Sequence, residues 1–457
     1  MSSPPHTHTL DVAFARSQFP ALSSSSSSRP SFIFADNAGG SQVTQSAIDK
    51  IVDYLSHTNV QLGADYAVSV VSTTRVDAGA EAARVLFNAR SVEEVAFGPS
   101  STANVENLAR ALEPGIEAGD EFIVTGEHEA NAGPWKKLAA RTGAVVKYWH
   151  SSPTNPNNPY SLNLKVEELL PLITSKTRLV AFTATSNLLG SVVPVAEITK
   201  ALRADAAAKG AKKVEVSIDC VAYAPHRRMD VQAWDIVSFS LSVFVLNNAA
   251  AQDFCVFSFY KVYAPHISAL YIRSSALTSS VSSIVHHFIQ PGSVPFYPPS
   301  YKLQPGGPGY EIVYSTTSVV PYLLSLTPAN DLDASFAAIA AHETQLATKL
   351  LGFLTAPEQA ARGVLVVGEE KPSVNRLPTV SFVVVGDRPM SSKAIVKVFD
   401  QRGGIGIRYG HFYAYTLASR LPPPVTIDEG AVRISLVHYN TLEEVDTIIG
   451  VLKEILA

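Results

Sequence analysis

The chain contains 457 residues, which is too long for one ordinary domain and fits two or three packed units. Hydrophobic residues make up 46% and charged residues 17%, so a large core can be buried and wholesale disorder is excluded. The formal net charge of −4 leaves no basic excess to bind nucleic acid or an anionic membrane, and the composition indicates a soluble, enzyme-sized α/β protein.

Residues 1–30 form a polar stretch that includes an unbroken serine run from Ser23 to Ser28. Such a stretch cannot bury enough apolar surface to fold, and we predict a flexible N-terminal arm. It lacks the apolar core of a secretory signal, while Asp11 and the sparse arginines argue against a transit peptide. No apolar run reaches the length needed to span a bilayer, so we expect a cytoplasmic protein without a membrane partner.

Residues 31–290 alternate between amphipathic helices and short β-prone runs, and we predict that they form a large domain. Ile48, Ile51, Val52 and Leu55 recur at helical spacing behind a helix start at Thr44. Apolar runs of strand length follow at residues 121–125, 178–183, 213–218 and 254–257. Helical stretches lie between several of these runs, which predicts a mostly parallel sheet with helices on both faces.

Residues 291–457 begin with a loop rich in Pro, Gly and Tyr that runs to about Gly309. A helical region follows, then an apolar strand-like run at residues 379–385 and a closing helix from Thr441. We predict that this part forms a smaller α+β domain behind a connecting loop.

Polar side chains follow several of the predicted strands, where ligands bind in open α/β sheets. Each has an ordinary explanation alone: a helix cap, a loop histidine or a surface lysine. Together they make a recognisable set, with hydroxyl groups at a helix start, a flat ring, an acid and a lysine at successive strand ends. These are the groups that hold pyridoxal phosphate through its phosphate, its ring nitrogen and a Schiff base. The side chains are Ser101, Thr102, His128, Asn187, Asp219 and Lys261.

The sequence SFYKVYAPH at residues 258–266 resembles the lysine motif of the class-V aminotransferases, a fold-type I family, in their cysteine desulfurase-like branch. Further matches occur in family order from about residue 33 to the C-terminus. They are DNAGG (36–40), TSNLLG (185–190), IDCVAYAPH (218–226), GIGIRYGH (404–411) and VRISLVHYN (432–440). The resemblance implies the fold of pyridoxal phosphate-dependent transferases over nearly the whole chain.

The resemblance also implies the roles of individual residues around pyridoxal 5′-phosphate. Lys261 would form the Schiff base and Asp219 would pair with the pyridinium nitrogen, so both would be catalytic together with His128. His128 would stack on the cofactor ring, and Asn187 would contact its phenolic oxygen. The phosphate would be held by Ser101, Thr102, Ala103 and Ser258.

The implied substrate is a small amino acid. Arg433, together with Arg408, would grip its carboxylate, a task that suits the bidentate guanidinium group. Members of the family are usually dimers with active sites at the subunit interface, so the resemblance implies a homodimer.

Three positions depart from the family pattern. A desulfurase that forms a persulfide needs a reactive cysteine on a loop of the smaller domain, and Tyr413 stands at that position here. Of the two cysteines of the chain, Cys220 follows Asp219 and Cys255 lies in a strand-like run, so we expect both to be buried and neither to serve as the sulfur acceptor. Tyr260 replaces a frequent histidine before the lysine, and Ala264 replaces a glycine, which predicts a strained cofactor loop.

The segment 237–252 separates two parts that follow each other almost directly in the family. Its sixteen residues are uncharged, apolar and β-prone, which makes them a poor surface loop. Without them the spacing from Asp219 to Lys261 falls from 42 to 26, the usual family value. A real loop or lid is one interpretation; we favour a translated intron, because the codons at its ends can be written as splice signals.

We therefore expect a pyridoxal phosphate-dependent enzyme that acts on a small amino acid. Without the loop cysteine, carbon–sulfur lyase or other α/β-carbon chemistry is the favoured prediction. Decarboxylative carbon–carbon bond formation, as in similar fungal enzymes of ustiloxin-type pathways, and transamination are the alternatives. The competing hypothesis from another class is a non-catalytic dimeric relative, or a product that the insertion inactivates.

Overall fold

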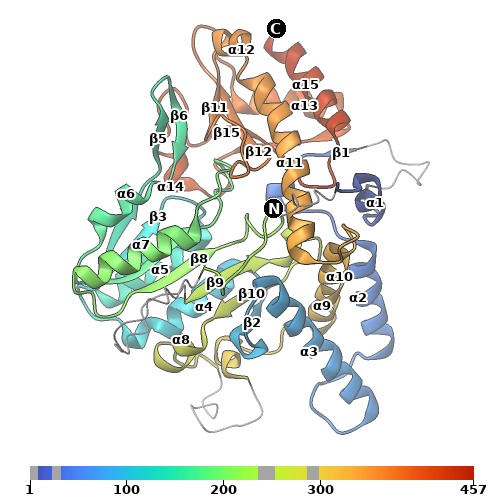
Figure 1. The fold of residues 1–457 in the computed structure, drawn as a ribbon, viewed down its shortest axis with the longest axis vertical. Coiled ribbons are helices and arrows are strands. Elements are labelled where there is room, and N and C mark those ends of the chain that lie inside the picture. The colour runs from blue at the N-terminus through green and yellow to red at the C-terminus, as the bar shows by residue number, and fades with distance from the viewer. Residues whose placement is uncertain (1–8, 23–31, 235–252, 286–297) are drawn as a thin grey trace, which may run out of the picture.

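In the part of the chain that the structure describes, the larger sheet (Figure 1) contains seven strands. The structure, a computed structural model, describes residues 9–22, 32–234, 253–285 and 298–457. Strand β10 is antiparallel to both of its neighbours, whereas every other adjacent pair is parallel, so the predicted mostly parallel sheet is confirmed. In spatial order the strands are β2 Val95–Gly98, β10 Ser268–Ile272, β9 Phe254–Ser258, β8 Glu215–Asp219, β7 Thr177–Thr183, β3 Glu121–Thr125 and β4 Val145–Trp149.

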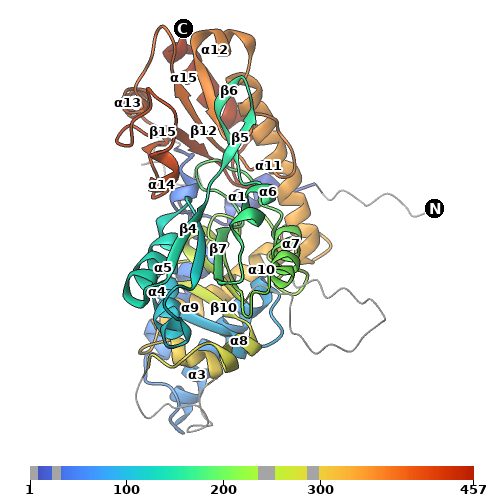
Figure 2. The same ribbon diagram turned by 90° about the vertical axis from the view of Figure 1, so that its left-hand side faces the viewer.

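Alternate residues of strands β3, β7 and β9 enter two different cores. Val180 and Phe182 pack beneath helices α3 (Ala67–Phe87) and α7 (Val195–Ala208), while Leu179 and Ala181 pack against the opposite layer. That layer contains α4 (Ser101–Leu112) and α5 (Glu129–Thr142), and Figure 2 shows it on the other side of the sheet from α7. Burial on both faces explains why the strands read as uninterrupted apolar runs.

Among the described residues of the C-terminal part, a second sheet contains four antiparallel strands. Its core packs against α11 (Leu332–Leu354), α13 (Ser392–Arg402) and α15 (Leu442–Leu456). Helix α15 begins behind Thr441, as predicted, and Thr441 and Glu444 form a reciprocal capping box. In spatial order the strands are β11 Val364–Val367, β12 Thr379–Val384, β15 Ala431–Ser435 and β14 Arg408–Gly410.

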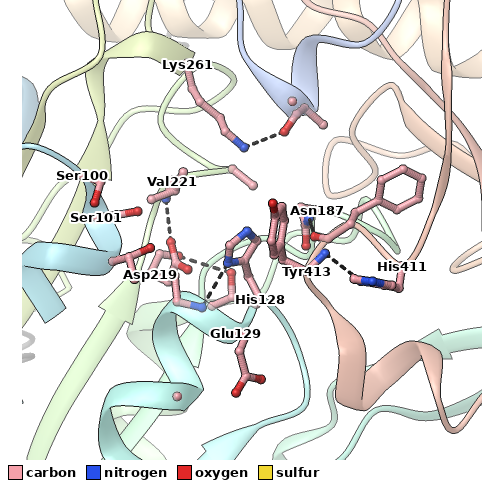
Figure 3. A pocket seen from close by; sticks show the side chains of 18 of the residues that line it. Ser100, Ser101, His128, Glu129, Asn187, Asp219, Val221, Lys261, His411 and Tyr413 are labelled. Carbon is pink, nitrogen blue, oxygen red and sulfur yellow. Dashed lines mark hydrogen bonds between the residues drawn. The ribbon is translucent and has the colours of Figure 1, made fainter. Parts of the chain in front are cut away.

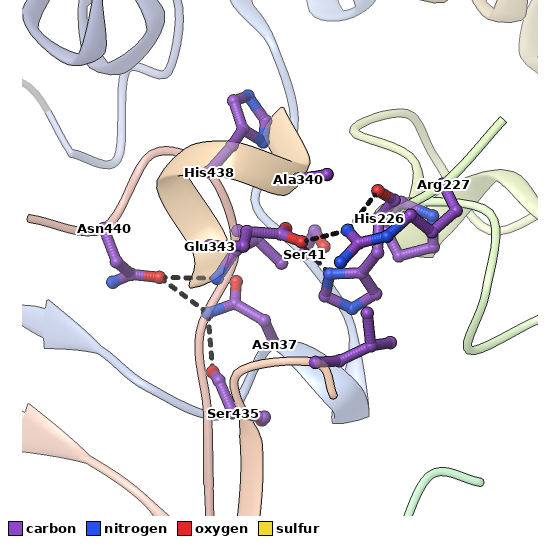
Figure 4. Close-up of polar contacts among 12 residues, drawn as sticks. Asn37, Ser41, His226, Arg227, Ala340, Glu343, Ser435, His438 and Asn440 are labelled. Carbon is purple, nitrogen blue, oxygen red and sulfur yellow. Dashed lines mark hydrogen bonds and ion pairs between the residues drawn. The ribbon is translucent and has the colours of Figure 1, made fainter. Parts of the chain in front are cut away.

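Helix α11 packs against both sheets (Figure 1). Phe336 and Ile339 in its first half enter the core of the larger sheet, whereas Leu346 and Leu350 enter the core of the smaller one. Between them Glu343 is fully buried and accepts hydrogen bonds from His226 Nδ1 at 2.8 Å and from the Arg227 guanidinium at 2.9 Å (Figure 4). The helix therefore fixes the loop behind β8, which begins at the candidate site, against the C-terminal half.

Helix α2 (Gln45–His57) begins behind Thr44 as predicted, but its apolar stripe does not face the core. Ile48, Val52 and Leu55 are 37%, 60% and 49% exposed, and the buried residues of the helix are Ala47 and Tyr54. Helices α9 (Tyr310–Ser315) and α10 (Val319–Leu324) pack beside α3, and α9 also contacts α2. Periodicity identified the helix correctly, but it does not show which face of the helix is buried in the chain.

Part of the predicted flexible arm is ordered. Helix α1 (Val12–Ser17) begins at an Asp11 cap, and Phe19 behind it is completely buried against the rings of Tyr263, Tyr322 and Tyr439. The large aromatic side chain of Phe19 buries enough apolar area to anchor this segment, although the composition of residues 1–30 is polar overall. The rest of the arm, residues 1–8 and 23–31, and the segment 237–252 lie outside the described residues.

The remaining elements are short. Strand β1 (Ile33–Phe34) pairs in parallel with β13 (Ile405–Gly406), and β5 (Ser152–Asn155) pairs with β6 (Asn158–Asn163). In the described ranges, no helix combines the length and apolarity needed to cross a bilayer. The other helices are α6 Val166–Leu169, α8 Ser274–Ser279, α12 Pro357–Arg362 and α14 Tyr415–Ala418.

Candidate active site

A cavity of about 820 Å³ opens where the strands of the larger sheet end and the smaller sheet begins (Figure 3). Side chains that follow β2, β3, β7, β8 and β9 reach it because the carboxyl ends of parallel strands meet at one edge. Arginines from β14 and β15 close the other side. The predicted site residues that line the cavity are Ser101, Thr102, His128, Asn187, Asp219, Lys261, Arg408 and Arg433.

The other two predicted residues, Ala103 and Ser258, are not among the lining residues. The Ala103 backbone N–H donates to Ser100 Oγ at 3.1 Å, which caps α4. Ser258 is fully buried at the end of β9, and its hydroxyl lies 3.0 Å from that of Ser268 on the neighbouring strand. Ser100 itself lines the cavity, so the helix start presents three hydroxyl residues in succession: Ser100, Ser101 and Thr102.

Lys261 occupies a short 3-10 turn directly after β9 and is only 4% exposed. Its Nζ donates to the Ala38 carbonyl at 2.5 Å. Burial and the nearby Arg433 charge lower the pKa of Lys261 to about 8, and the Asp219 carboxylate opposes the shift. A substantial fraction of the amine is therefore neutral near physiological pH, the form that attacks a carbonyl.

Asp219 ends β8 at the centre of the sheet and is 6% exposed. Its Oδ1 accepts a hydrogen bond from the Val221 backbone N–H at 2.9 Å. Burial raises the pKa of this carboxyl, while the Val221 hydrogen bond and the Lys261 charge work against the rise. A positively charged ligand atom beside Asp219 would favour the ionised form of this carboxyl group.

His128 caps α5 and is held as a neutral ring. Its Nδ1 accepts the Ala130 backbone N–H at 3.2 Å, which leaves the proton on Nε2. Burial lowers the pKa of His128 to about 4, and the charges of Lys261 and Arg433 add to the effect. A fixed, uncharged imidazole is suited to lie against another flat ring.

Asp36 joins the two predicted carboxylate-binding arginines, a role that the sequence did not reveal. Its Oδ2 accepts from Arg408 Nε at 2.8 Å, and its Oδ1 accepts from the Arg433 guanidinium at 3.1 Å. Arg433 is 2% exposed, and its Nε has no partner among the described residues. The segment behind Asp36 is held in turn by Asn37, whose side chain donates to the Ser435 carbonyl at 2.9 Å (Figure 4).

The two cysteines are buried, as predicted, and both are free thiols. Cys220 Sγ lies 3.3 Å from Cys255 Sγ, and burial raises the pKa of the Cys220 thiol well above its usual range. Neither side chain lines the cavity. Tyr413, at the position where a loop cysteine was sought, does line it.

The strain expected at Ala264 is absent, because this residue does not take the left-handed conformation. Its neighbour Tyr263 takes it instead, with φ of 68°. The Tyr263 hydroxyl donates to the Pro225 carbonyl at 3.0 Å and its ring is completely buried. The packing of the Tyr263 ring stabilises a turn for which a glycine was expected to be necessary.

The residues present fit the pyridoxal phosphate that the sequence predicts. The start of α4 offers hydroxyl and N–H groups to a phosphate, Asp219 offers a buried carboxyl, and Lys261 offers an amine. Arg433 Nε and Asn187 Oδ1 are buried polar atoms without a partner in the described part of the chain, as expected for atoms that face a ligand. Across the same residues, no cluster of three or more metal-ligating side chains occurs.

Comparison with known proteins identifies the family. Its sequence model, described as Aminotransferase class-V, matches residues 33–243 and 246–448. The Aminotransferase-like protein FGM3 of Gibberella zeae is 38% identical over 98% of this chain and 99% of its own length. The Cysteine desulfurase-like protein ustD of Aspergillus flavus is 30% identical over 99% of this chain and 92% of its own length. The apo structure of a cysteine desulfurase from Thermococcus onnurineus, at 20% identity, superposes with a TM-score of 0.77 over 100% of this chain and 99% of that one, which supports the fold.

Proposed function

This chain belongs to the class-V aminotransferase family and is a pyridoxal phosphate-dependent enzyme, and we propose that it transforms a small amino acid at its α- and β-carbons without forming a persulfide on itself. The observation that carries the proposal is the position of the sulfur atoms. Both thiols are buried away from the cavity, and a tyrosine lies where a sulfur acceptor would be needed. A buried thiol with a raised pKa supplies little thiolate, and the thiolate is the nucleophile.

The bound cofactor would act as an electron sink for a carbanion at the α-carbon of the substrate. Lys261 would hold the cofactor and then take or return the proton at that carbon, a role that its pKa of about 8 supports. Asp219 would keep a proton on the ring nitrogen. Arg433 would hold the substrate carboxylate with its unpartnered Nε and orient the bond to be broken.

Carbon–sulfur lyase chemistry is the favoured reaction type. The leaving sulfur would depart as free sulfide or thiol, because no accessible thiol lies on the described cavity wall. Carbon–carbon bond formation is a second candidate, and the size of the cavity supports it. Beyond the predicted cofactor residues the cavity extends to Glu106, Pro134 and Asp428, which leaves room for a second reactant.

The test uses purified holoenzyme and L-cysteine without added thiol. We expect sulfide release, while mass spectrometry of intact protein and of the peptides that contain Cys220 and Cys255 finds no added sulfur. A persulfide on either cysteine would contradict the proposal. A Cys220→Ala, Cys255→Ala double variant is the matched control, since it should release sulfide at the wild-type rate.

We further propose a homodimer, because two helices expose apolar side chains that a second copy would cover. Val52 and Leu55 on α2 are 60% and 49% exposed, and Val68 and Val71 on α3 are also exposed. Light scattering should give twice the chain mass. Val52→Glu should shift the mass towards the monomer, whereas Val374→Glu, at an equally exposed position in the C-terminal half, should not. A wild-type monomer would contradict this assembly.

A cytoplasmic location completes the proposal. With two cysteines in 457 residues, both buried, the chain has no disulfide framework to require an oxidising compartment. Fractionation of cells that produce the tagged protein should place it with cytoplasmic markers, and recovery with a membrane-enclosed organelle would contradict this location.

A further inference from the structure

Tyr260 and Tyr413, the two tyrosines that depart from the family pattern, both line the candidate active-site cavity. They lie 153 positions apart in sequence and come from the two halves of the chain: Tyr260 directly precedes Lys261, and Tyr413 belongs to the loop behind β14. Because both side chains line one cavity, they can contact the same ligand. The contacts that hold each ring decide whether they do so in a fixed arrangement.

The backbone fixes Tyr413. Phe412 and Tyr413 both take the left-handed conformation, with φ of 52° and 61°, a cost that persists only where the surroundings enforce it. The Tyr413 carbonyl accepts the Glu129 backbone N–H at 2.8 Å, and the Tyr413 N–H donates to His411 Nδ1 at 3.1 Å. The Tyr413 ring lies beside that of His128, with centroids 5.5 Å apart (Figure 3).

The same loop is tied to two predicted ligand-binding residues through Phe412. The Asn187 side-chain amide donates to the Phe412 carbonyl at 2.9 Å, and the Arg433 guanidinium lies 3.9 Å from the centre of the Phe412 ring. Tyr413 is therefore placed relative to the arginine that would hold the substrate carboxylate. The backbone of this loop is therefore anchored on both sides, while the Tyr413 side chain borders the cavity and is itself 69% exposed.

Tyr260 is held from two sides. Its ring stacks on His266, with centroids 4.8 Å apart and planes 8° apart. On another side it lies so close to Gly40 that an added Cβ would come within 3.2 Å of Tyr260 Cδ2. Lys261 Nζ lies 5.7 Å from the centre of the same ring. The phenol group is thus fixed beside the amine on which the chemistry depends.

The surroundings of Tyr260 favour its protonated form. Burial raises the pKa of Tyr260, and Asp219 and Tyr413 raise it further. Near neutral pH the Tyr260 phenol keeps its proton and acts as a hydrogen-bond donor. An oxygen atom of a ligand is the natural acceptor for such a donor.

We propose that Tyr260 and Tyr413 form a phenol pair that contacts the substrate and binds a hydroxyl or carbonyl oxygen carried at its β-carbon. The pair would select amino acids with an oxygen function at this carbon over their deoxy counterparts. This inference rests on the proposed function, because it requires an amino acid held beside Lys261, and it favours β-carbon chemistry on an oxygen-bearing substrate over the carbon–sulfur lyase reaction.

The test is a binding titration of the holoenzyme, followed by the visible absorbance of its cofactor. L-Serine is compared with L-alanine, and L-threonine with L-2-aminobutyrate, in wild type, Tyr260→Phe, Tyr413→Phe and the double variant. Each single variant should weaken binding of the hydroxylated amino acid by about 5- to 10-fold, the loss expected for one hydrogen bond, and leave its deoxy partner within about 2-fold. Tyr415→Phe is the control, because Tyr415 is 53% exposed near the same loop but is not a lining residue.

The outcomes separate the two proposals. Equal losses for both members of each amino-acid pair, or no loss in the double variant, would overturn the phenol pair and leave the proposed function in place. A wild-type holoenzyme whose spectrum responds to no amino acid would overturn the proposed function and the pair with it. Thermal melting of each variant, expected at the wild-type temperature, shows that a loss of binding is not a loss of folding.

Discussion

Replacing Lys261 with methionine should stabilise the cofactor-free protein at neutral pH. The lysine is 4% exposed, and burial lowers its pKa from 10.5 to about 8. Below that pKa the folded protein carries a buried charge that the unfolded chain exposes to water. Methionine has a similar length and no charge, so it removes this cost.

The size of the expected stabilisation follows from how far folding lowers the pKa of Lys261. A difference of roughly 2.5 pKa units corresponds to about 3 kcal/mol, and the lost hydrogen bond to the Ala38 carbonyl takes back about 1 kcal/mol. Because folding lowers the pKa of Lys261, the unfolded chain binds more protons between about pH 8 and 10.5, and wild-type stability rises with pH across that window. The variant should therefore be more stable by about 2 kcal/mol near pH 7 and should lose most of that advantage by about pH 10.

Urea unfolding of both proteins without cofactor measures the effect, with tryptophan fluorescence as the signal. Trp135 and Trp149 are completely buried beside the larger sheet and should report its loss. Lys200→Met, at an exposed position on α7, is the matched control and should give a difference that does not vary with pH. A Lys261→Met protein that is less stable than wild type near pH 7, or an advantage that is constant with pH, would refute the reasoning.

Three further predictions concern other parts of the chain. Asp36→Asn should lower the free energy of unfolding by about 3 kcal/mol, because it removes the charge that faces the buried Arg433. Arg408→Gln, at a side chain 59% exposed, should lower it by less than about 1 kcal/mol, and equal urea midpoints for the two variants would contradict this. Asp219→Ala should still bind the cofactor but stop exchange of the substrate α-proton in deuterated water, and NMR detection of normal exchange would remove the acid from the mechanism. Deletion of residues 237–252 should raise soluble yield, melting temperature and cofactor content together, and a lower cofactor content would mean that the segment is a working part of the fold.

The sequence predicted the larger sheet well because its central strands are covered on both faces. Val180 and Leu179 point to opposite cores, so the middle of β7, residues 179–182, is apolar at every position and the run is easily recognised. The face of α2 could not be predicted in the same way. Periodicity reports that Val52 and Leu55 share an apolar stripe, but it does not report what covers them.

The candidate site was predictable where chemistry follows a strand end directly. Asp219 and Lys261 fall at such ends, and the topology brings them to one cavity. Ser258 lies three residues before Lys261, yet its hydroxyl turns towards Ser268 inside the sheet. The direction of a side chain at a strand end depends on the pleat and on the turn behind it, which a motif does not encode. Asp36 was missed for a related reason, since its partners Arg408 and Arg433 are nearly the whole chain away.

The pairing of β1 with β13 has a consequence for synthesis on the ribosome. Ile33 pairs with Ile405, and Asp36 binds Arg408 across 372 positions of sequence, so the first strand emerges long before its partner exists. The Asp219 and Lys261 strand ends can assemble in the meantime, but the arginine side of the cavity cannot close until the C-terminal strands leave the exit tunnel. Nascent chains arrested before β13 should therefore carry a half-built pocket, and prematurely terminated products should be unable to hold the substrate carboxylate even if their larger sheet is folded.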